Sequence, residues 1–349
     1  MAAFEERLVD GLNQGALCLM ISVGHRTGLF DVMAASGPTT PQALAERLGL
    51  HPRYVTEWLG AMATGQIVEA DTDAGTYALP DEHARLLTRS TPAENLAVFA
   101  QYIPLLGSVE DQIVECFAHG GGVDYAAYPR FHEVMEEDSG QTVLTALSEH
   151  ILPLVPGLTD RLDQGINVID VGCGRGRALN QLAAWFPNST FTGYDLSENA
   201  IAYARATAEH RGLANASFHA QDAAQLGEVV DTGSVQLVTT FDAVHDQADP
   251  QTVVQAIHDS LADDGVYLAQ DIDSSGDHHG DLDHPIGPLL YTISCLHCMT
   301  VSLARDGAGF GAMWGRERAE RLFRGAGFSE VEVHTLDHDP QNAYFVCRP

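Results

Sequence analysis

The sequence predicts an α/β protein in which a mostly helical amino-terminal part precedes a doubly wound parallel sheet. Two observations carry this prediction. From about residue 165 onward, short runs of apolar and β-branched residues alternate with stretches of helical periodicity. Before that point apolar residues recur mostly at helical spacing, and one short hairpin pattern interrupts them.

The carboxy-terminal half supplies the elements of the sheet in alternating order. Alternation favours parallel pairing, because each helix carries the chain back to the same end of the sheet. The expected strands are 167–171, 189–195, 216–220, 235–241 and 265–271, and the expected helices between them are 177–186, 198–210 and 250–261. A last helix at 316–326 precedes two closing strands at 331–334 and 343–347.

The amino-terminal part contains two helices with helix-turn-helix spacing. Thr39 or Thr40 can cap a helix whose first position is Pro41, and Gly49 supplies the break before a second helix over 52–62. Two short strand patterns, 67–70 and 76–79, follow around an Asp-Thr-Asp-Ala-Gly turn. Together these elements predict a winged helix-turn-helix fold.

The charge of the second helix argues against the DNA binding that a winged helix often serves. Arg53 is the only cation between residues 52 and 62, and Glu57 follows one turn later. Because binding to phosphates depends on Lys and Arg, we expect no nucleic-acid partner. We expect the winged domain, 1–95, to serve packing and dimerisation.

Two further segments complete the expected organisation. Residues 96–160 form a helical linker with a Gly-Gly-Gly loop at 120–122, and Tyr125, Tyr128, Phe131 and His132 follow as aromatic groups that could line a cavity. Residues 161–349 form the domain with the parallel sheet. Core packing is the commoner use of such aromatic residues.

The charge composition is unusual. Forty-eight acidic residues face 18 basic ones, a net charge of −30, and every basic residue is arginine because the sequence has no lysine. This bias resembles that of proteins from extremely halophilic archaea, in which a carboxylate coat repels itself unless salt screens the charge. The resemblance implies a halophilic archaeal source.

The remaining composition bears on location and redox state. No apolar run is long enough for a membrane helix, and the first residues show neither a basic start nor a cleavage pattern, so we expect a cytoplasmic protein without a membrane partner. Six scattered cysteines are expected to be reduced. Cys295 and Cys298 lack a second ligand pair for a structural zinc site.

A glycine loop follows the first expected strand in Asp170-Val-Gly-Cys-Gly-Arg-Gly176. Gly172, Gly174 and Gly176 let the backbone turn sharply and approach a ligand. A dinucleotide fingerprint would place its third glycine at Arg177, and a phosphate-binding P-loop would need a lysine. Neither alternative fits.

The spacing Asp-x-Gly-x-Gly-x-Gly resembles the cofactor loop of class I S-adenosylmethionine-dependent methyltransferases. The resemblance implies that S-adenosylmethionine binds at Asp170 and the three glycines, that an acid after the second strand holds the ribose hydroxyls, and that an acid after the third strand meets adenine. These acids are Asp195 and Asp222, and Leu196, Ala223 and Phe241 complete the expected cofactor site. A carboxylate suits two adjacent hydroxyl donors.

The segment after the fourth strand resembles the His-Asp motif of small-molecule O-methyltransferases with an amino-terminal winged domain. The resemblance implies a homodimer and gives His245 the role of the base that deprotonates the acceptor hydroxyl. Gln247 departs from the tryptophan common at this place, and a structural histidine that caps the next helix is the alternative.

Acceptor contacts are expected from the carboxy-terminal part. Apolar and polarisable groups there are Tyr291, His297, Met299, Met313 and Trp314, although core filling is the commoner role of each one. The loop 273–284 is rich in Asp and His, but so acidic a chain is expected to carry such loops, and no metal is expected.

The sequence therefore predicts S-adenosylmethionine-dependent methyl transfer to a small-molecule acceptor, with oxygen ahead of sulfur and nitrogen. Two alternatives stay open. One is a winged-helix transcriptional regulator that uses the second domain as a sensor. The other is an enzyme that uses the same cofactor and scaffold for a reaction other than methylation.

Overall fold

The computed structural model describes residues 3–349. The chain divides into two compact units, Met1–Ser108 and Val109–Pro349. The three-part division at residues 95 and 160 stays a prediction. Within the described residues no single helix is long and apolar enough to cross a bilayer. Two helices, Phe4–Thr27 and Leu29–Ser36, reach that length and composition only as a pair bent by 72°.

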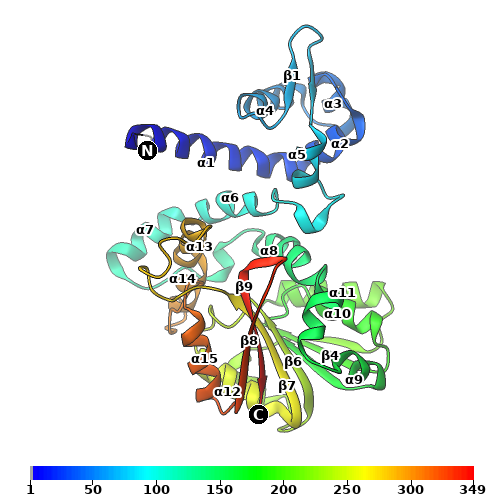
Figure 1. Cartoon of the computed structure of the whole chain (residues 1–349), viewed down its shortest axis with the longest axis vertical. Helices are drawn as coiled ribbons and strands as arrows, with labels where there is room; N and C mark the ends of the chain where they lie inside the picture. Colours follow the sequence, from blue (N-terminus) through cyan, green and yellow to red (C-terminus); the bar gives the residue numbers. More distant parts are fainter. Residues whose placement is uncertain (1–2) are drawn as a thin grey trace. The chain divides into compact units, whose positions relative to one another are not determined.

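The first unit is helical with one hairpin (Figure 1). Thr40 caps α3, since its Oγ1 accepts the N–H of Ala43 at 3.2 Å, and Gly49 ends this helix with a left-handed φ of 64°. The elements are α1 (Phe4–Thr27), α2 (Leu29–Ser36), α3 (Pro41–Leu48), α4 (Pro52–Thr64), β1 (Glu69–Asp71), β2 (Thr76–Ala78), α5 (Asp81–Leu87), η1 (Pro92–Glu94), η2 (Phe99–Gln101) and α6 (Tyr102–Gly107). The predicted helix pair and hairpin are confirmed.

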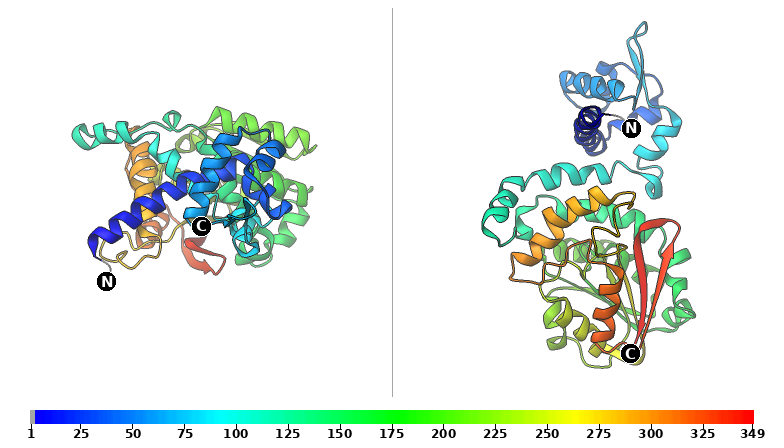
Figure 2. Two further views of the ribbon diagram at one scale, coloured as in Figure 1. Left: turned by 90° about the horizontal axis from the view of Figure 1, so that it is seen from above. Right: turned by 60° about the vertical axis from the view of Figure 1, so that its left-hand side comes forward.

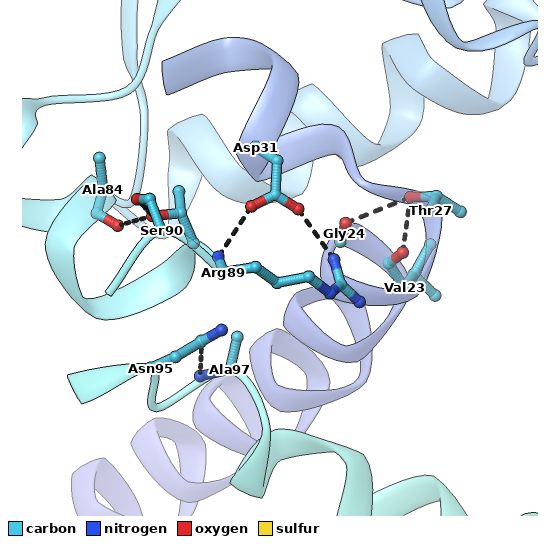
Figure 3. A network of polar contacts seen from close by, with 10 residues as sticks. Val23, Gly24, Thr27, Asp31, Ala84, Arg89, Ser90, Asn95 and Ala97 are labelled. Carbon is cyan, nitrogen blue, oxygen red and sulfur yellow. Dashed lines mark hydrogen bonds and ion pairs between the residues drawn. The ribbon is translucent and has the colours of Figure 1, made fainter. Parts of the chain in front are cut away.

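Two interactions tie distant parts of this unit together. Trp58 is buried in its core, packs edge-on against Phe30 at 5.1 Å and donates its indole N–H to the Met20 carbonyl at 2.8 Å. Figure 3 shows that Asp31 of α2 accepts both the backbone N–H and the guanidinium of Arg89, each at 2.8 Å. The segment after α5 is thereby fastened to α2.

The second unit contains the seven-stranded sheet in the order β5-β4-β3-β6-β7-β9-β8. The first five strands in this order are parallel, and β9 joins them in antiparallel fashion. The strands are β3 (Asn167–Val171), β4 (Thr190–Asp195), β5 (Ala216–Ala220), β6 (Val235–Phe241), β7 (Leu261–Ile272), β8 (Glu330–Leu336) and β9 (Asp339–Arg348). The predicted doubly wound sheet is confirmed.

Helices cover both faces of the sheet (Figures 1 and 2). α10 (Arg177–Trp185) and α11 (Glu198–His210) pack on one face, against Val168 and Leu237. α12 (Pro250–Ser260) and α15 (Arg316–Gly325) pack on the other, against Ile169 and Val238. Neighbouring strand residues thus point to opposite cores, which is why these strands are apolar throughout.

Shorter and less regular helices complete this unit. Before the sheet come α7 (Glu110–His119), η3 (Tyr125–Ala127), α8 (Phe131–Ser139), η4 (Gly140–Leu144), η5 (Leu147–Ile151), η6 (Leu152–Leu154) and α9 (Leu158–Gln164). Within or after it come η7 (Ala223–Glu228), α13 (Gly287–Ile293), η8 (Ser294–Cys298) and α14 (Met299–Leu303). Three of these, η4, η5 and η8, are π-helical, a geometry often found near functional sites.

Candidate active site

A cavity of about 790 Å³ lies in the second unit, at the carboxyl ends of β3, β4 and β6. Two groups of lining residues differ in origin. The first, which we term the sheet-edge half, consists of Asp170, Gly172, Gly174, Asp195, Leu196, Ala223 and Phe241. The second, the aromatic wall, consists of Tyr125, Tyr128, Phe131 and His132.

The glycine loop needs its glycines for two reasons. Gly172 and Gly176 have φ values of 75° and 67°, in the left-handed region that side chains rarely adopt. A Cβ at Gly172 would lie 2.4 Å from that of Ala243, and one at Gly176 would lie 2.4 Å from the Phe218 ring. Gly176 therefore serves the packing of α10 on the sheet and does not line the cavity.

Asp195 connects the glycine loop to the end of β4. Its two carboxylate oxygens accept the N–H groups of Gly174 at 2.9 Å and Ser197 at 2.8 Å. Each oxygen has a second lone pair, and the side chain lines the cavity, so the carboxylate can still accept two hydroxyl groups of a ligand.

Asp170 is buried beneath the loop. Burial, partly opposed by a hydrogen bond from Thr239 at 2.8 Å and reinforced by the charge of Asp195, raises the pKa of this carboxyl to about 7. Asp170 lines the cavity and would be ionised more readily beside a cationic group. A positively charged ligand is therefore favoured at this point.

Asp222 stands where the third-strand acid was expected but does not line the cavity. One of its oxygens accepts the N–H of Ala224 at 3.0 Å and the other accepts Arg305 at 3.1 Å. Arg305 itself lines the cavity. The group that meets a ligand at this corner is thus the guanidinium, and the carboxylate lies behind it.

The aromatic wall is a packed cluster of rings. Phe131 stacks on His297 with ring centres 3.9 Å apart, and Tyr125 and Tyr128 meet the same imidazole edge-on at 5.1 and 4.7 Å. Burial, reinforced by His245 and His132, lowers the pKa of His297 to about 3, so this ring is neutral. His297 supports the wall from behind and does not line the cavity.

Arginines of the glycine loop fasten the helix that carries part of the aromatic wall. Arg175 binds the Glu136 carboxylate of α8 at 2.7 Å, and Arg177 donates to the backbone carbonyl of the same residue at 2.9 Å. The Arg175 guanidinium also lies 4.2 Å from the centre of the Tyr203 ring. These contacts join the two groups of lining residues.

His245 is buried beside the cavity and does not line it. Its Nδ1 lies 2.6 Å from an oxygen of Asp271, which also accepts the indole N–H of Trp314 at 3.0 Å. Burial favours the neutral ring, but the Asp271 carboxylate outweighs it, and Cys298 within hydrogen-bonding reach adds to the effect, so the pKa of His245 is raised well above its usual value.

Asp242 completes the only group among residues 3–349 in which three side chains could together hold a metal ion. Ligand atoms of Asp242, His245 and Asp271 lie within 4.8 Å of one another. A hydrogen bond at Nδ1 accounts for the close approach of His245 and Asp271 to each other. Burial and the Asp271 charge raise the pKa of Asp242 well above its usual value, which favours its neutral form.

None of the five expected acceptor contacts lines the cavity. Tyr291 donates to Asp281 at 2.8 Å, and Met313 packs in a small core with Leu290. Trp314 binds Asp271, and His297 lies behind Phe131. Met299 begins α14, next to Gly311. The structure gives these side chains packing and hydrogen-bonding partners outside the cavity.

The comparisons with known proteins concern both units. Residues 15–89 match the Rv2258c-like winged helix-turn-helix domain, and residues 162–294 match a methyltransferase domain. The chain is a methyltransferase. A search of curated proteins finds no significant match for it.

Solved structures share the fold of this methyltransferase over its whole length. Examples are a candidate O-methyltransferase from Nostoc punctiforme (18% identity, all of both chains, TM-score 0.75) and the mitomycin 7-O-methyltransferase MmcR (19% identity, 100% of this chain and 98% of that one, TM-score 0.71). Human N-acetylserotonin methyltransferase in complex with S-adenosylmethionine is another (17% identity, 99% and 98%, TM-score 0.70).

The sheet-edge half suits S-adenosylmethionine, the cofactor of the methyltransferase domain. Gly172 brings bare backbone to the cavity, Asp195 offers acceptors for a diol, and Asp170 favours a cation. The predicted use of this cofactor is confirmed, while the role of each contact stays a prediction.

Several lining residues were not among the site residues expected from the sequence. Asp246 and Gln247 come directly after His245, so the motif itself contained them, but their access to the cavity depends on tertiary packing. Arg305 and Glu136 have no local signature at all. Only the spatial meeting of α8, α14 and the sheet edge brings them to the methyltransferase cavity.

Proposed function

We propose that the protein transfers the methyl group of S-adenosylmethionine to a hydroxyl oxygen of a small, planar molecule. One observation carries this proposal: a single cavity is lined both by the glycine loop with Asp195 and by the aromatic wall. Cofactor and acceptor can therefore be held next to each other and away from water.

The cofactor supplies a methyl group that its positive sulfur already activates. The residues of the chain have to hold and align the two reactants. Asp195 and the glycine loop are suited to hold the cofactor, and Tyr125 and Phe131 offer flat faces against which an aromatic acceptor can stack. Oxygen is favoured as the attacking atom because carboxylates that can take its proton lie at the cavity.

The test is incubation of the purified protein with methyl-deuterated cofactor and a panel of hydroxylated aromatic compounds. We expect at least one product that is heavier by one labelled methyl group, together with demethylated cofactor. Loss of the cofactor without a methylated product would favour the non-methylating alternative. The Asp195→Ala variant should form much less product at a cofactor concentration that only just saturates the wild-type protein, and raising the cofactor concentration should restore it.

We propose further that the protein is a homodimer through α1. The helix exposes an apolar stripe along its length, formed by Phe4, Leu8, Leu12, Leu19 and Val23, which are 42–71% exposed. A second copy of the same stripe would bury it, in line with the dimerisation role implied by the resemblance. Light scattering should give twice the chain mass, and Leu8→Glu with Leu12→Glu should give a monomer.

We also propose adaptation to molar salt, as the composition of halophilic archaeal proteins would imply. The support is the net charge of −30. Screening of carboxylate repulsion should raise the melting temperature steeply between low and molar KCl. A melting temperature independent of KCl would contradict this proposal and leave the methyl-transfer proposal untouched.

A further inference from the structure

The side chain of His245 is closed off from the cavity. Only 4% of it is exposed. Its Nδ1 is engaged with Asp271, Cys298 lies within hydrogen-bonding reach of the ring, and its backbone carbonyl accepts the N–H of Gly311 at 3.2 Å. An acceptor molecule in the cavity has no surface of this imidazole to touch, so a proton cannot pass to it directly.

The next residue, Asp246, has the opposite placement. It is half-buried, and it lines the cavity together with Gln247 and the aromatic-wall residue Tyr125. The Tyr125 hydroxyl donates a hydrogen bond to Asp246 Oδ2, while Oδ1 is approached by the Gln247 amide only at 3.4 Å. One carboxylate oxygen therefore has acceptor capacity left at the cavity surface.

We infer that Asp246, and not His245, is the group that accepts the proton of the acceptor hydroxyl. This inference rests on the proposed methyl transfer to oxygen. As the acceptor oxygen bonds to the methyl carbon, its O–H bond breaks and the proton moves to Asp246, while the carbon–sulfur bond breaks and leaves its electron pair on sulfur. The proton is later released to solvent when product leaves.

Burial has the largest effect on Asp246 and opposes its ionisation. His245 on the same loop favours the ionised form, as does the hydrogen bond from Tyr125 of η3. Asp271 at the end of β7 and Asp195 at the end of β4 oppose ionisation, and the Cys298 thiol of η8 also interacts electrostatically with this carboxylate. The balance raises the pKa of Asp246 to about 6, which makes it a better base than an ordinary carboxylate and leaves it ionised at neutral pH.

His245 then acts as a positioning residue. Its interaction with the buried Asp271 keeps the imidazole cationic, and this cation lies next to the Asp246 carboxylate. Removal of the positive charge should raise the pKa of Asp246. The acidic limb of the rate profile, which falls as pH drops through about 6 in the wild-type protein, should then move to higher pH.

The experiment compares kcat of the Asp246→Asn variant with that of the wild-type protein on two acceptors that differ in acidity. An ordinary phenol, with a pKa of about 10, needs a base at neutral pH. A nitro-substituted phenol that is already ionised at the assay pH does not. We expect kcat to fall by about 10²- to 10⁴-fold on the first acceptor and by less than about tenfold on the second. The affinity for S-adenosylmethionine should stay within about twofold.

Further variants separate this inference from its competitors. Asp246→Glu keeps a carboxylate and should recover part of the rate. Asp231→Asn changes an exposed carboxyl group away from the cavity and serves as the control. His245→Gln should shift the acidic limb of the pH–rate profile to higher pH but retain the plateau rate within about tenfold. Equal losses on both phenols in Asp246→Asn would overturn the inference, as would a loss of 10² or more at all pH values in His245→Gln alone. The two phenols are taken from the panel compounds that the wild-type protein methylates, and failure to methylate any compound of the panel would instead refute the proposed function.

Discussion

The two groups of residues around the cavity are held in place by different means. The sheet-edge half consists mostly of backbone turns and short side chains at the ends of parallel strands, and its hydrogen bonds, such as that from Gly174 to Asp195, join neighbouring strand ends. The aromatic wall consists of large side chains on short helices, held by ring stacking and by the arginines of the glycine loop. This division would allow the residues that contact the acceptor to change while those that hold the cofactor stay the same.

The largest effect confined to one of the two groups should come from Asp195→Ala, which should change cofactor binding and leave acceptor binding almost unchanged. Loss of a charged acceptor for the ribose hydroxyls costs about 2 kcal/mol, which is about a 30-fold weaker affinity for S-adenosylmethionine. The KM of the acceptor at saturating cofactor should change less than threefold. Calorimetry and steady-state kinetics measure the two quantities. Unchanged cofactor affinity would contradict the role given to Asp195.

The reciprocal prediction concerns Phe131→Ala. The ring lines the cavity and stacks on His297, so its removal takes away a face for the acceptor and a support of the wall. We expect the acceptor KM to rise about tenfold, since an aromatic contact and its buried area contribute about 1–2 kcal/mol. Cofactor affinity should stay within twofold. The Phe131→Leu variant retains bulk without a flat face, so its acceptor KM should lie between those of the wild-type protein and Phe131→Ala.

These two variants also mark what the sequence could and could not predict. The glycine loop, Asp195, Leu196, Ala223 and Phe241 stand at or just after the ends of successive strands, so the strand pattern together with the methyltransferase resemblance was sufficient to place them at one edge. The helix cap at Thr40 and the strands of the sheet were also predictable, because each is encoded in a short stretch of neighbouring residues.

The opposite half of the cavity depended on contacts between segments far apart in the chain. Tyr125 and His297 are separated by more than 170 positions yet their rings meet at 5.1 Å. The expectation that Tyr291, Met299, Met313 and Trp314 contact the acceptor had only residue type behind it, and none of the four lines the cavity. Residue type alone does not tell which face of a helix is covered.

A smaller effect is expected at the corner formed by Arg305 and Asp222. Arg305→Ala should weaken cofactor binding about three- to fivefold, because a partly exposed guanidinium contributes about 1 kcal/mol or less. If Asp222 acts only by holding Arg305, the double variant with Asp222→Asn should bind no more weakly than Arg305→Ala alone. Additive losses would show that Asp222 meets the cofactor independently, as the methyltransferase resemblance implied.

The smallest expected effect lies at the joint between the two halves, in Glu136→Gln. This change removes the charge that Arg175 binds at 2.7 Å but keeps the side-chain shape and the backbone carbonyl that Arg177 uses. Both charged side chains are about one-fifth exposed, so the pair contributes more than a surface pair and less than a buried one. We expect a two- to fivefold rise in the acceptor KM at low salt and almost none in molar KCl, where the Debye length is about 3 Å.

Glu317→Gln, which removes an exposed partner of Arg321 on α15, is the matched control and should have no effect. An equal rise in the cofactor dissociation constant would show that the arginines hold the glycine loop itself in place, and the two halves would then have to be treated as one structural unit.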